Sequence, residues 1–351
     1  MSERKYFIDW LRVIAIWILI MYHIVGMFQE IASRFYFIQS PQLLKVLLVP
    51  ISIFNVFRIP LLFFVSGMGI YFSLQRRTWK QLLGERIKRI LIPFIFGFFF
   101  IVPIQFFFYQ KYYLQELNYT PGWGHLWFLA NIFLYVLIFI PLLYYFKHHP
   151  YNKFIVFFRN LIGRYPVAIY LLVLPYILHA LTIPSSLFYW MFFDPRVGAL
   201  LGAFAFLLGF IFISFGEVVW KSISKLKYYA LAIAFILFFV RLFVFGLEGP
   251  HLLTAIESIN WIIASFGFGY TFLNKKSKPL TYLNGASYPV YIVHMAFQFL
   301  GAYIIFPLNL TPWFNLVFLI VFTFAGCYLT YEIIRRISFL RPLFGMKVMK
   351  K

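Results

Sequence analysis

The stretch IPFIFGFFFIVPIQFFFY, residues 92–109, is 18 residues long and contains no charged side chain. A helix needs about 20 mostly apolar residues to cross a bilayer, so this stretch is typical of a membrane span. Nine further stretches share this character, and their runs are continuous rather than alternating as in a β-barrel strand. The sequence therefore predicts an all-α polytopic membrane protein with ten spans, at residues 10–28, 53–73, 92–109, 126–146, 166–183, 197–215, 228–245, 256–273, 285–306 and 313–334.

The composition of the whole chain supports this prediction. Of its 351 residues, 63% are hydrophobic and 12% are charged, whereas a soluble domain is about 45–50% apolar and about 25% charged. This excess of apolar side chains excludes ordinary soluble enzymes and disordered proteins, and the single cysteine, Cys327, excludes a disulfide framework. The longest connections, 110–125 and 147–165, are too short to build a core of their own. We expect one transmembrane domain over residues 1–351, with no separate soluble domain.

The basic residues predict the orientation of the spans. The net charge is +21, from 31 Lys and Arg against 10 Asp and Glu. With ten spans, 25 of the 31 basic residues lie on the same side of the membrane as the N-terminus. Loops rich in Lys and Arg are typically cytoplasmic, so this side is predicted to be the inside. Both termini are therefore predicted to be cytoplasmic, in a multi-pass protein of the inner (plasma) membrane. Topology and anionic lipid explain the charge, so we expect membrane lipid and not nucleic acid as a partner. The six exceptions are Arg34, Lys45, Arg58, Lys111, Arg196 and Arg241.

Ionisable side chains within apolar spans usually face the interior of a bundle or a wet cavity. In the first span, eleven steps of about 100° bring His23 to within about 20° of Arg12 on the helix surface. Asp9 lies on the same stripe, and Arg12 and His23 are roughly 16 Å apart in depth at about 1.5 Å per residue. A topological anchor explains Arg12 equally well, and an interfacial position is the alternative for His23. Glu332, at the inner end of the tenth span, is expected to pair with an arginine.

Further candidates lie in the second span and in the loop that follows it. Arg58 is inside the outer leaflet and needs an anion or another acceptor as a partner. For Ser66 and Gly67, close helix packing is the favoured interpretation. Arg86 and Arg89 are spaced i, i+3, so on a helix their planar guanidinium groups project side by side and suit phosphate oxygens. Positive-inside anchoring explains the charge of these two arginines equally well.

Two later spans contain the remaining candidates. His125 and Trp127 open the fourth span at the outer interface, where an aromatic belt explains the tryptophan but not the histidine. In the ninth span, Tyr288, Tyr291 and His294 follow one another at intervals of three residues. His294 is predicted near the middle of the membrane, and a hydrogen-bonded core histidine is the alternative to a functional one.

These residue types favour group transfer to a hydroxyl. Cation pumps place Asp or Glu at mid-membrane, and the sequence predicts almost no acidic residue there. No zinc-binding spacing, GxSxG elbow or P-loop occurs, so no metal is expected. A histidine has a reference pKa near 6.5 and can act as a general base at pH 7, while arginines orient an anionic donor. The alternatives are a glycolipid transporter or flippase without covalent chemistry, and a receptor, which leaves the stripe of the first span unexplained.

Five segments in order resemble the membrane acyltransferase-3 family. The first contains the Arg-x10-His spacing of the first span, and the similarity extends from residue 4 to about residue 340. The chain is most similar to the branch that contains the periplasmic-glucan succinyltransferase, in its opening RxYFxD, in Phe57-Arg58 and in Tyr331-Glu332-Ile. The five segments are RKYFIDWLR with the following His23, FFVSG (63–67), RIKRILIP (86–93), HLWFL (125–129) and SYPVYIVH (287–294).

This resemblance implies a membrane O-acyltransferase that moves an acetyl or succinyl group from cytoplasmic acyl-CoA to a hydroxyl of an extracytoplasmic or lipid-linked glycan. It implies that Arg86 and Arg89 hold the CoA phosphates, with Arg12 near the path, and that His23 is the general base or a transient acyl carrier. A separate periplasmic transferase is a further expected partner, unless the chain completes the transfer itself. We expect substrate binding from Arg58, His125, Trp127, Tyr288, Tyr291 and His294, and structural roles for Asp9, Ser66, Gly67 and Glu332.

Overall fold

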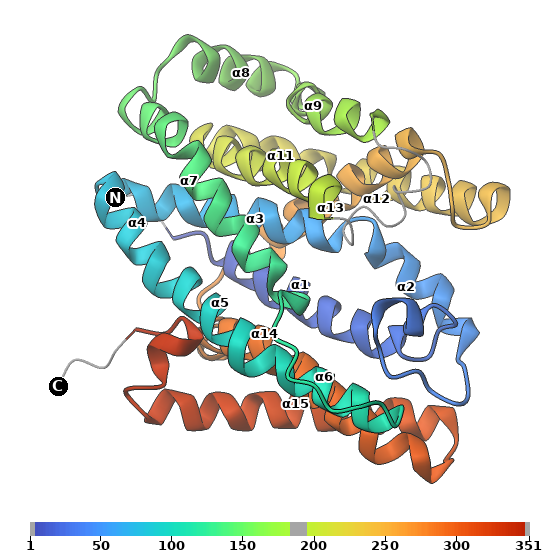
Figure 1. The fold of residues 1–351 in the computed structure, drawn as a ribbon. Coiled ribbons are helices and arrows are strands. Elements are labelled where there is room, and N and C mark those ends of the chain that lie inside the picture. Colours follow the sequence, from blue (N-terminus) through green and yellow to red (C-terminus); the bar gives the residue numbers. More distant parts are fainter. Residues whose placement is uncertain (1–3, 183–194, 348–351) are drawn as a thin grey trace. The chain divides into compact units, whose positions relative to one another are not determined.

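The computed structural model describes residues 4–182 and 195–347, and over these residues its regular structure is entirely helical (Figure 1). Two shorter apolar helices, Pro166–Leu181 and Gly198–Ser214, coincide with the predicted fifth and sixth spans. The prediction of an all-α polytopic membrane protein is confirmed, while the count of ten spans and the orientation stay predictions. Among the described residues, eight helical segments are long and apolar enough to cross a membrane: Tyr6–Gly26, Lys45–Gln75, Trp79–Tyr112, Gly124–His148, Glu217–Phe245, His251–Phe272, Lys278–Leu308 and Pro312–Arg336.

Several spans begin earlier than predicted, and the third and the seventh differ most. The third begins at Trp79 rather than at residue 92, because π-helical turns at Ile87–Leu91 and Gly97–Ile101 join its α-helical parts into one segment. The seventh begins at Glu217 rather than at residue 228. Hydropathy locates only the apolar part of a span, whereas the backbone hydrogen bonds of a helix continue through its basic turns. The helices are α1 (Tyr6–Gly26), α2 (Leu48–Asn55), α3 (Arg58–Gln75), α4 (Trp79–Arg86), α5 (Ile92–Phe96), α6 (Val102–Tyr112), α7 (Trp127–His148), α8 (Lys153–Arg164), α9 (Ile169–Leu181), α11 (Pro195–Ser214), α12 (Glu217–Phe245), α13 (His251–Phe272), α14 (Lys278–Ile305) and α15 (Pro312–Arg336).

The chain forms two compact units that are interleaved in the sequence. Unit 1 consists of residues 1–15, 52–83 and 134–281, and unit 2 consists of residues 16–51, 84–133 and 282–351. Five helices, α1, α2, α4, α7 and α14, therefore contribute residues to both units. The single domain expected over residues 1–351 stays a prediction.

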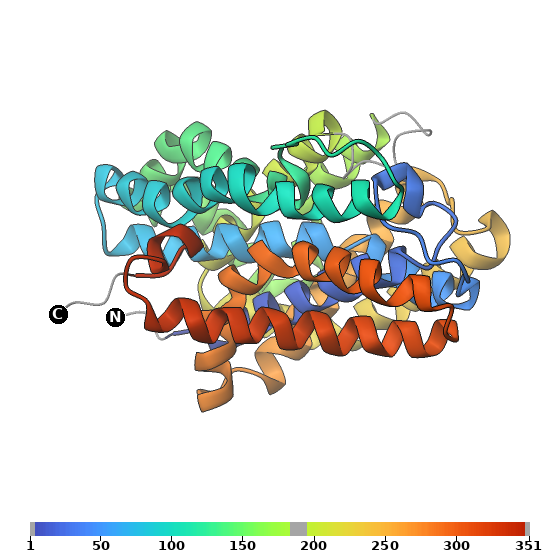
Figure 2. The same cartoon turned by 60° about the horizontal axis from the view of Figure 1, so that its bottom comes forward.

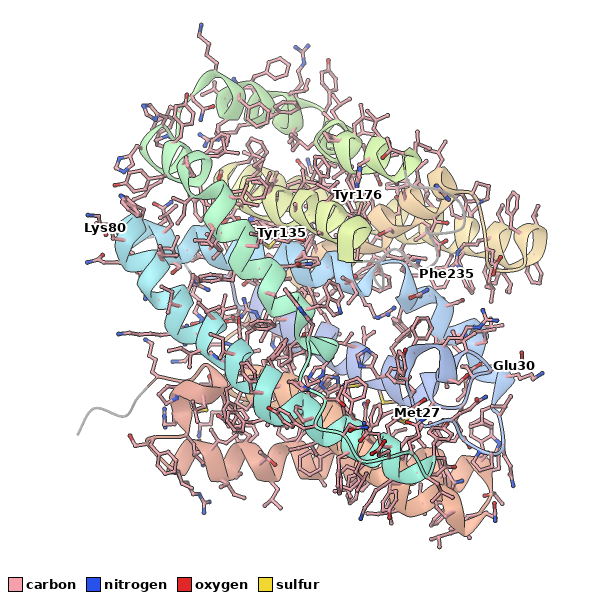
Figure 3. All side chains as sticks on the ribbon, in the orientation of Figure 1. Met27, Glu30, Lys80, Tyr135, Tyr176 and Phe235 are labelled. Atoms are coloured by element: carbon pink, nitrogen blue, oxygen red, sulfur yellow. The ribbon has the colours of Figure 1, made fainter. Side chains whose placement is uncertain are left out.

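In unit 1, glycines allow helices α3 and α11 to approach closely. A Cβ atom at Gly67 would collide with the carbonyl oxygen of Phe206, and one at Gly209 would collide with the carbonyl oxygen of Phe64. Backbones can come this close between membrane helices only where side chains are small. The core of the unit also contains two buried tyrosines that Figure 3 labels, Tyr135 on α7 and Tyr176 on α9.

Unit 1 also contains a buried ion pair between α12 and α13. Nε of Arg241 donates to Oε2 of Glu257 at 2.7 Å and Nη2 donates to Oε1 at 3.0 Å, with side chains only 1% and 0% exposed. Arg241 also donates to the carbonyl oxygens of Leu247 (3.1 Å) and Ser52 (3.2 Å), and the indole of Trp261 donates to Glu257 (3.3 Å). Glu257 is thus a buried acidic residue at the start of the predicted eighth span, and the expectation of almost no acidic residue at mid-membrane stays a prediction. One Arg and one Glu in consecutive spans were the signal in the sequence.

In unit 2, α14 and α15 lie side by side in both views (Figures 1 and 2). A Cβ atom at Gly301 would lie 2.9 Å from side-chain atoms of Leu319 and Phe322 on α15. Nε1 of Trp17, in the later half of α1, donates to the hydroxyl of Tyr328 on α15 at 3.0 Å. These contacts place the later half of α1, α14 and α15 in one packed group.

Candidate active site

Three histidines from separate segments converge in unit 2. His23 lies near the end of α1, His125 in the 3-10 turn Gly124–Leu126, and His294 in the middle of α14. Nδ1 of His23 is 3.1 Å from Nε2 of His294, and the ring centroids of His125 and His294 are 4.8 Å apart. His294 is 0% exposed and His125 is 8% exposed, whereas His23 is partly exposed. We call these three residues the histidine cluster.

The turn before α7 aims His125 at α14. Gly124 has a φ of +44°, a backbone conformation that glycine adopts without strain, and a Cβ there would lie 3.0 Å from Val102 and 3.1 Å from Gln105. Nε2 of His125 lies 3.0 Å from the carbonyl oxygen of Ile292, and the hydroxyl of Tyr291 donates to the carbonyl oxygen of His125. Two hydrogen bonds in opposite directions therefore fix His125 to α14.

The hydrogen bonds of His294 determine where the protons of the cluster lie. Nδ1 of His294 is 2.7 Å from the carbonyl oxygen of Tyr291, which can only accept, so Nδ1 carries the hydrogen. In the neutral ring Nε2 then has the lone pair and accepts from Nδ1 of His23. A neutral His23 that donates from Nδ1 has its own lone pair on Nε2. The network thus assigns to His23 the tautomer in which Nε2 is the basic atom.

The geometry of the two rings agrees with this hydrogen bond. Their planes are 9° apart and their centroids are separated by 5.3 Å. This separation is close to the largest that a contact of 3.1 Å between ring nitrogens allows, so the rings meet edge to edge. A hydrogen bond between imidazoles requires this arrangement, because the lone pair lies in the plane of the ring.

Gln298 is a site residue that sequence analysis missed. It is 0% exposed, and its Nε2 donates to the carbonyl oxygen of Ile20 at 3.0 Å. Gln298 lies one turn after His294, and Ile20 lies about one turn before His23, so this bond joins α14 to α1 beside the histidine contact. A buried amide four residues from His294 on the same helix face was the available signal.

The two predicted phosphate ligands share an acidic partner. Nη2 of Arg86 is 3.0 Å from Oε2 of Glu85, and Nη1 of Arg89 is 3.2 Å from Oε1 of the same carboxylate. The Arg86 and Glu85 side chains are 14% and 15% exposed, and that of Arg89 is 40% exposed. A Cβ at Gly345 would lie 2.8 Å from the Arg89 carbonyl oxygen and 3.1 Å from Tyr288, so these residues are neighbours. One carboxylate facing two guanidinium groups leaves one excess positive charge.

The other predicted polar residues of the interior lie in unit 1. Asp9 accepts from Arg4 at 2.7 Å and from Arg12 at 3.2 Å. Arg58 is 3% exposed and donates to Oδ1 of Asn55 at 2.6 Å, which is an acceptor partner of the kind its position required. Of the predicted site residues, unit 2 therefore brings together the histidine cluster with Tyr291, and it brings Tyr288 close to the two arginines.

Three further predicted residues make local contacts. The hydroxyl of Ser66 donates to the carbonyl oxygen of Leu62 at 2.7 Å, within α3. Glu332 accepts from Nε of Arg335 at 2.9 Å and from the hydroxyl of Tyr282 at 2.9 Å. The ring of Trp127 lies 6.4 Å from that of Phe128. Within residues 4–182 and 195–347, no three His, Cys, Asp or Glu side chains are placed to share a metal ion.

Comparison with known proteins identifies the family. The model of the acyltransferase-3 family, described as an acyltransferase domain, matches residues 5–332. The chain belongs to the acyltransferase-3 family. This acyltransferase is 24% identical over 387 residues to glucans biosynthesis protein C of Escherichia coli O1:K1 / APEC, an alignment that covers 100% of the chain and 96% of the relative. The protein of the same name from Escherichia coli strain K12 / DH10B has the same identity and coverage. No solved structure is significantly similar to the chain.

The family and the fold agree on the class of protein. Its family shows that the protein is an acyltransferase, and the long apolar helices of its described residues agree with a multi-pass membrane protein. The histidine cluster and the two arginines both fall within the matched residues.

Proposed function

We propose that this membrane acyltransferase moves an acetyl or succinyl group from acyl-CoA to a hydroxyl of an extracytoplasmic or lipid-linked glycan, with His23 as the general base. The hydrogen bond from Nδ1 of His23 to Nε2 of His294 carries the proposal, because it makes Nε2 of His23 the proton acceptor. The name of the relatives, glucans biosynthesis protein C, supports a glycan as the acceptor. We place the protein in the inner membrane, with a separate periplasmic transferase as a second partner.

The proposed reaction needs one basic nitrogen at the acceptor hydroxyl. Nε2 of His23 takes the hydroxyl proton while the oxygen attacks the thioester carbonyl carbon. The tetrahedral intermediate then collapses, the C–S bond breaks, and the CoA sulfur leaves with the proton that His23 returns. If His23 instead carries the acyl group, the same Nε2 attacks the thioester carbon first, the C–S bond breaks and CoA leaves as the thiolate. The acceptor hydroxyl then attacks the acyl carbon, the C–N bond breaks so that Nε2 recovers its lone pair, and the hydroxyl proton passes to the CoA thiolate. Both routes require Nε2 unprotonated and Nδ1 protonated.

The arginine pair is the proposed binding site for the donor phosphates. Arg86 and Arg89 already orient two guanidinium groups toward one carboxylate, that of Glu85. Phosphate oxygens match the same donor geometry, so a bound donor replaces Glu85 as their partner. Arg12 remains part of the proposal because it lies on α1, as His23 does, and the family's Arg-x10-His spacing includes it.

The test compares wild-type protein with His23→Gln in nanodiscs. Gln keeps a polar side chain of similar size but takes up no proton near neutral pH. We expect wild type to release CoA from acetyl-CoA or succinyl-CoA in the presence of isolated envelope glycan, and mass spectrometry to show one added acyl mass. We expect His23→Gln to lower this rate by about 10²–10⁴.

The matched control is His149→Gln, because His149 is exposed and lies outside the cluster. It is expected to keep wild-type activity. A His23→Gln rate within about threefold of wild type, a difference of about 0.65 kcal/mol, would exclude His23 as the catalytic base. Wild-type protein that moves glycolipid without consuming acyl-CoA would favour the transporter.

A further inference from the structure

We infer that His294 is a positioning residue, which holds His23 in the tautomer that makes its Nε2 basic. This inference rests on the proposed role of His23 as the base. It assigns His294 a different task from the substrate binding that sequence analysis expected. Both ring nitrogens of His294 are engaged by protein atoms, Nδ1 by the Tyr291 carbonyl and Nε2 by His23, and the side chain is 0% exposed.

The hydrogen bonds of His294 have a defined direction. An isolated neutral imidazole exchanges between two tautomers, and its partners select one of them. The carbonyl oxygen of Tyr291 has no hydrogen to donate, so it fixes the proton of His294 on Nδ1 at 2.7 Å. The remaining lone pair of His294 then selects the Nδ1–H tautomer of His23. The carbonyl of Tyr291 thus sets the tautomer of His294, and His294 in turn sets the tautomer of His23.

The ring of His294 is restrained by its neighbours. The ring of His125 contacts it edge-on, at 77° and 4.8 Å between centroids, while His125 itself is held by the carbonyl of Ile292. One turn later along α14, Gln298 donates to the carbonyl of Ile20 and so fixes the spacing between α14 and the later half of α1. Ring orientation and helix spacing together maintain the 3.1 Å contact with His23.

Loss of this acceptor affects the tautomer of His23. Without Nε2 of His294, the Nε2–H tautomer of His23 becomes accessible. In this tautomer Nε2 of His23 already carries a hydrogen and cannot take a proton from a hydroxyl. A fraction of the enzyme then holds an unreactive base, so kcat falls. Binding of acyl-CoA does not involve the ring, so its KM is unaffected.

The experiment compares His294→Phe, which removes the acceptor, with His294→Gln, which offers an amide oxygen in a similar place. We expect His294→Phe to lower kcat by about 10- to 1,000-fold with KM for acyl-CoA within about twofold. His294→Gln is expected to recover kcat to within about tenfold of wild type. A ring retained only for packing predicts the opposite order, because Phe fills the space of an imidazole better than Gln does.

The second readout is the tautomer itself, measured by ¹⁵N NMR of protein labelled at its histidines. The His23 signals are assigned by their loss in His23→Gln. We expect a protonated Nδ1 and an unprotonated Nε2 in wild type, and protonation of Nε2 in a large fraction of His294→Phe. This measurement on wild type stands even where a variant fails to fold. A wild-type His23 with its hydrogen on Nε2 would overturn the inference.

The results separate this inference from the proposed function. Full kcat in His294→Phe together with an inactive His23→Gln overturns the positioning role and leaves the base in place. Full activity in His23→Gln refutes the proposed function itself. Reduced kcat in His294→Phe with rescue by Gln and a changed His23 tautomer supports both.

Discussion

Single residues show how this apolar interior accommodates polar groups. The buried side chains of His125, Gln298 and His294 each make at least one hydrogen bond, because an unpaired polar group away from water costs about 1–3 kcal/mol. Nδ1 of His125 and Oε1 of Gln298 nevertheless have no hydrogen-bond partner among the described residues. His294 uses both ring nitrogens, and Arg241 uses a carboxylate and two carbonyl oxygens. Several hydrogen bonds, rather than one contact, therefore hold each of these two side chains.

The Arg241–Glu257 pair offers a direct test of this principle. Arg241→Met leaves the carboxylate of Glu257 buried without its guanidinium, so we expect a loss of about 3–5 kcal/mol in stability. The double variant Arg241→Met/Glu257→Leu leaves no buried charge and is expected to regain most of this loss. The measurement is the thermal unfolding midpoint in detergent, with the exposed Arg76→Met as the control. A double variant no more stable than Arg241→Met would contradict the prediction.

At the scale of helices, the segment from Trp79 to Tyr112 illustrates how local structure positions a site. Its first turns are basic and its later turns are apolar, and the π-helical turn Ile87–Leu91 includes one of the two arginines. The spacing of Arg86 and Arg89 predicted that they project side by side, and the structure shows both within reach of Glu85. An acyl donor must therefore displace the carboxylate of Glu85 in order to bind to these two arginines.

We predict that Arg86→Ala and Arg89→Ala each raise the KM for acyl-CoA. A charge-assisted hydrogen bond contributes about 1.5–3 kcal/mol, which corresponds to a change of roughly ten- to a hundredfold. Lys at either position should rescue only in part, because it lacks the planar fork. Glu85→Gln should lower the KM, since the donor phosphate no longer competes with a carboxylate. Steady-state kinetics check all five variants, and a KM unchanged in both alanine variants would return the arginines to a role in topology.

The close approach of α3 and α11 gives a prediction about packing. We expect Gly67→Ala to destabilise the protein by about 1–3 kcal/mol, because its Cβ meets the backbone of Phe206, which cannot move without separating the helices. Gly84→Ala is the matched control, since a Cβ there has no neighbour within 4 Å. Thermal unfolding and the yield of monodisperse protein measure the difference. Equal stability of the two variants would show that α3 and α11 do not require this contact.

At the scale of the whole molecule, the distribution of charge predicts which ends of the helices face the cytoplasm. The donor reaches the arginines from the inside only if the loop after the second span is cytoplasmic, so the proposed direction of transfer depends on topology. In the described part of the chain the cysteine, Cys327, is 0% exposed, so introduced cysteines can be labelled over a low background.

We predict that Asn118→Cys is labelled from outside intact cells by a membrane-impermeant thiol reagent and that Lys276→Cys is not. Both positions are exposed in the structure. Lysed cells provide the control, because both cysteines should then react. Labelling in the reverse pattern would overturn the orientation and, with it, the entry of acyl-CoA from the cytoplasmic side.

The sequence by itself determined the class of the protein, the approximate positions of its apolar helices and its family. These properties depend on runs of neighbouring residues and on motifs within single segments, which local physical chemistry controls. Only the tertiary structure decided that His23, His125 and His294 meet, that Gln298 lies beside them, and that Arg241 pairs with Glu257. Each of these facts is a contact between segments that are distant in the sequence, and the packing of those segments is set by many weak contacts acting together.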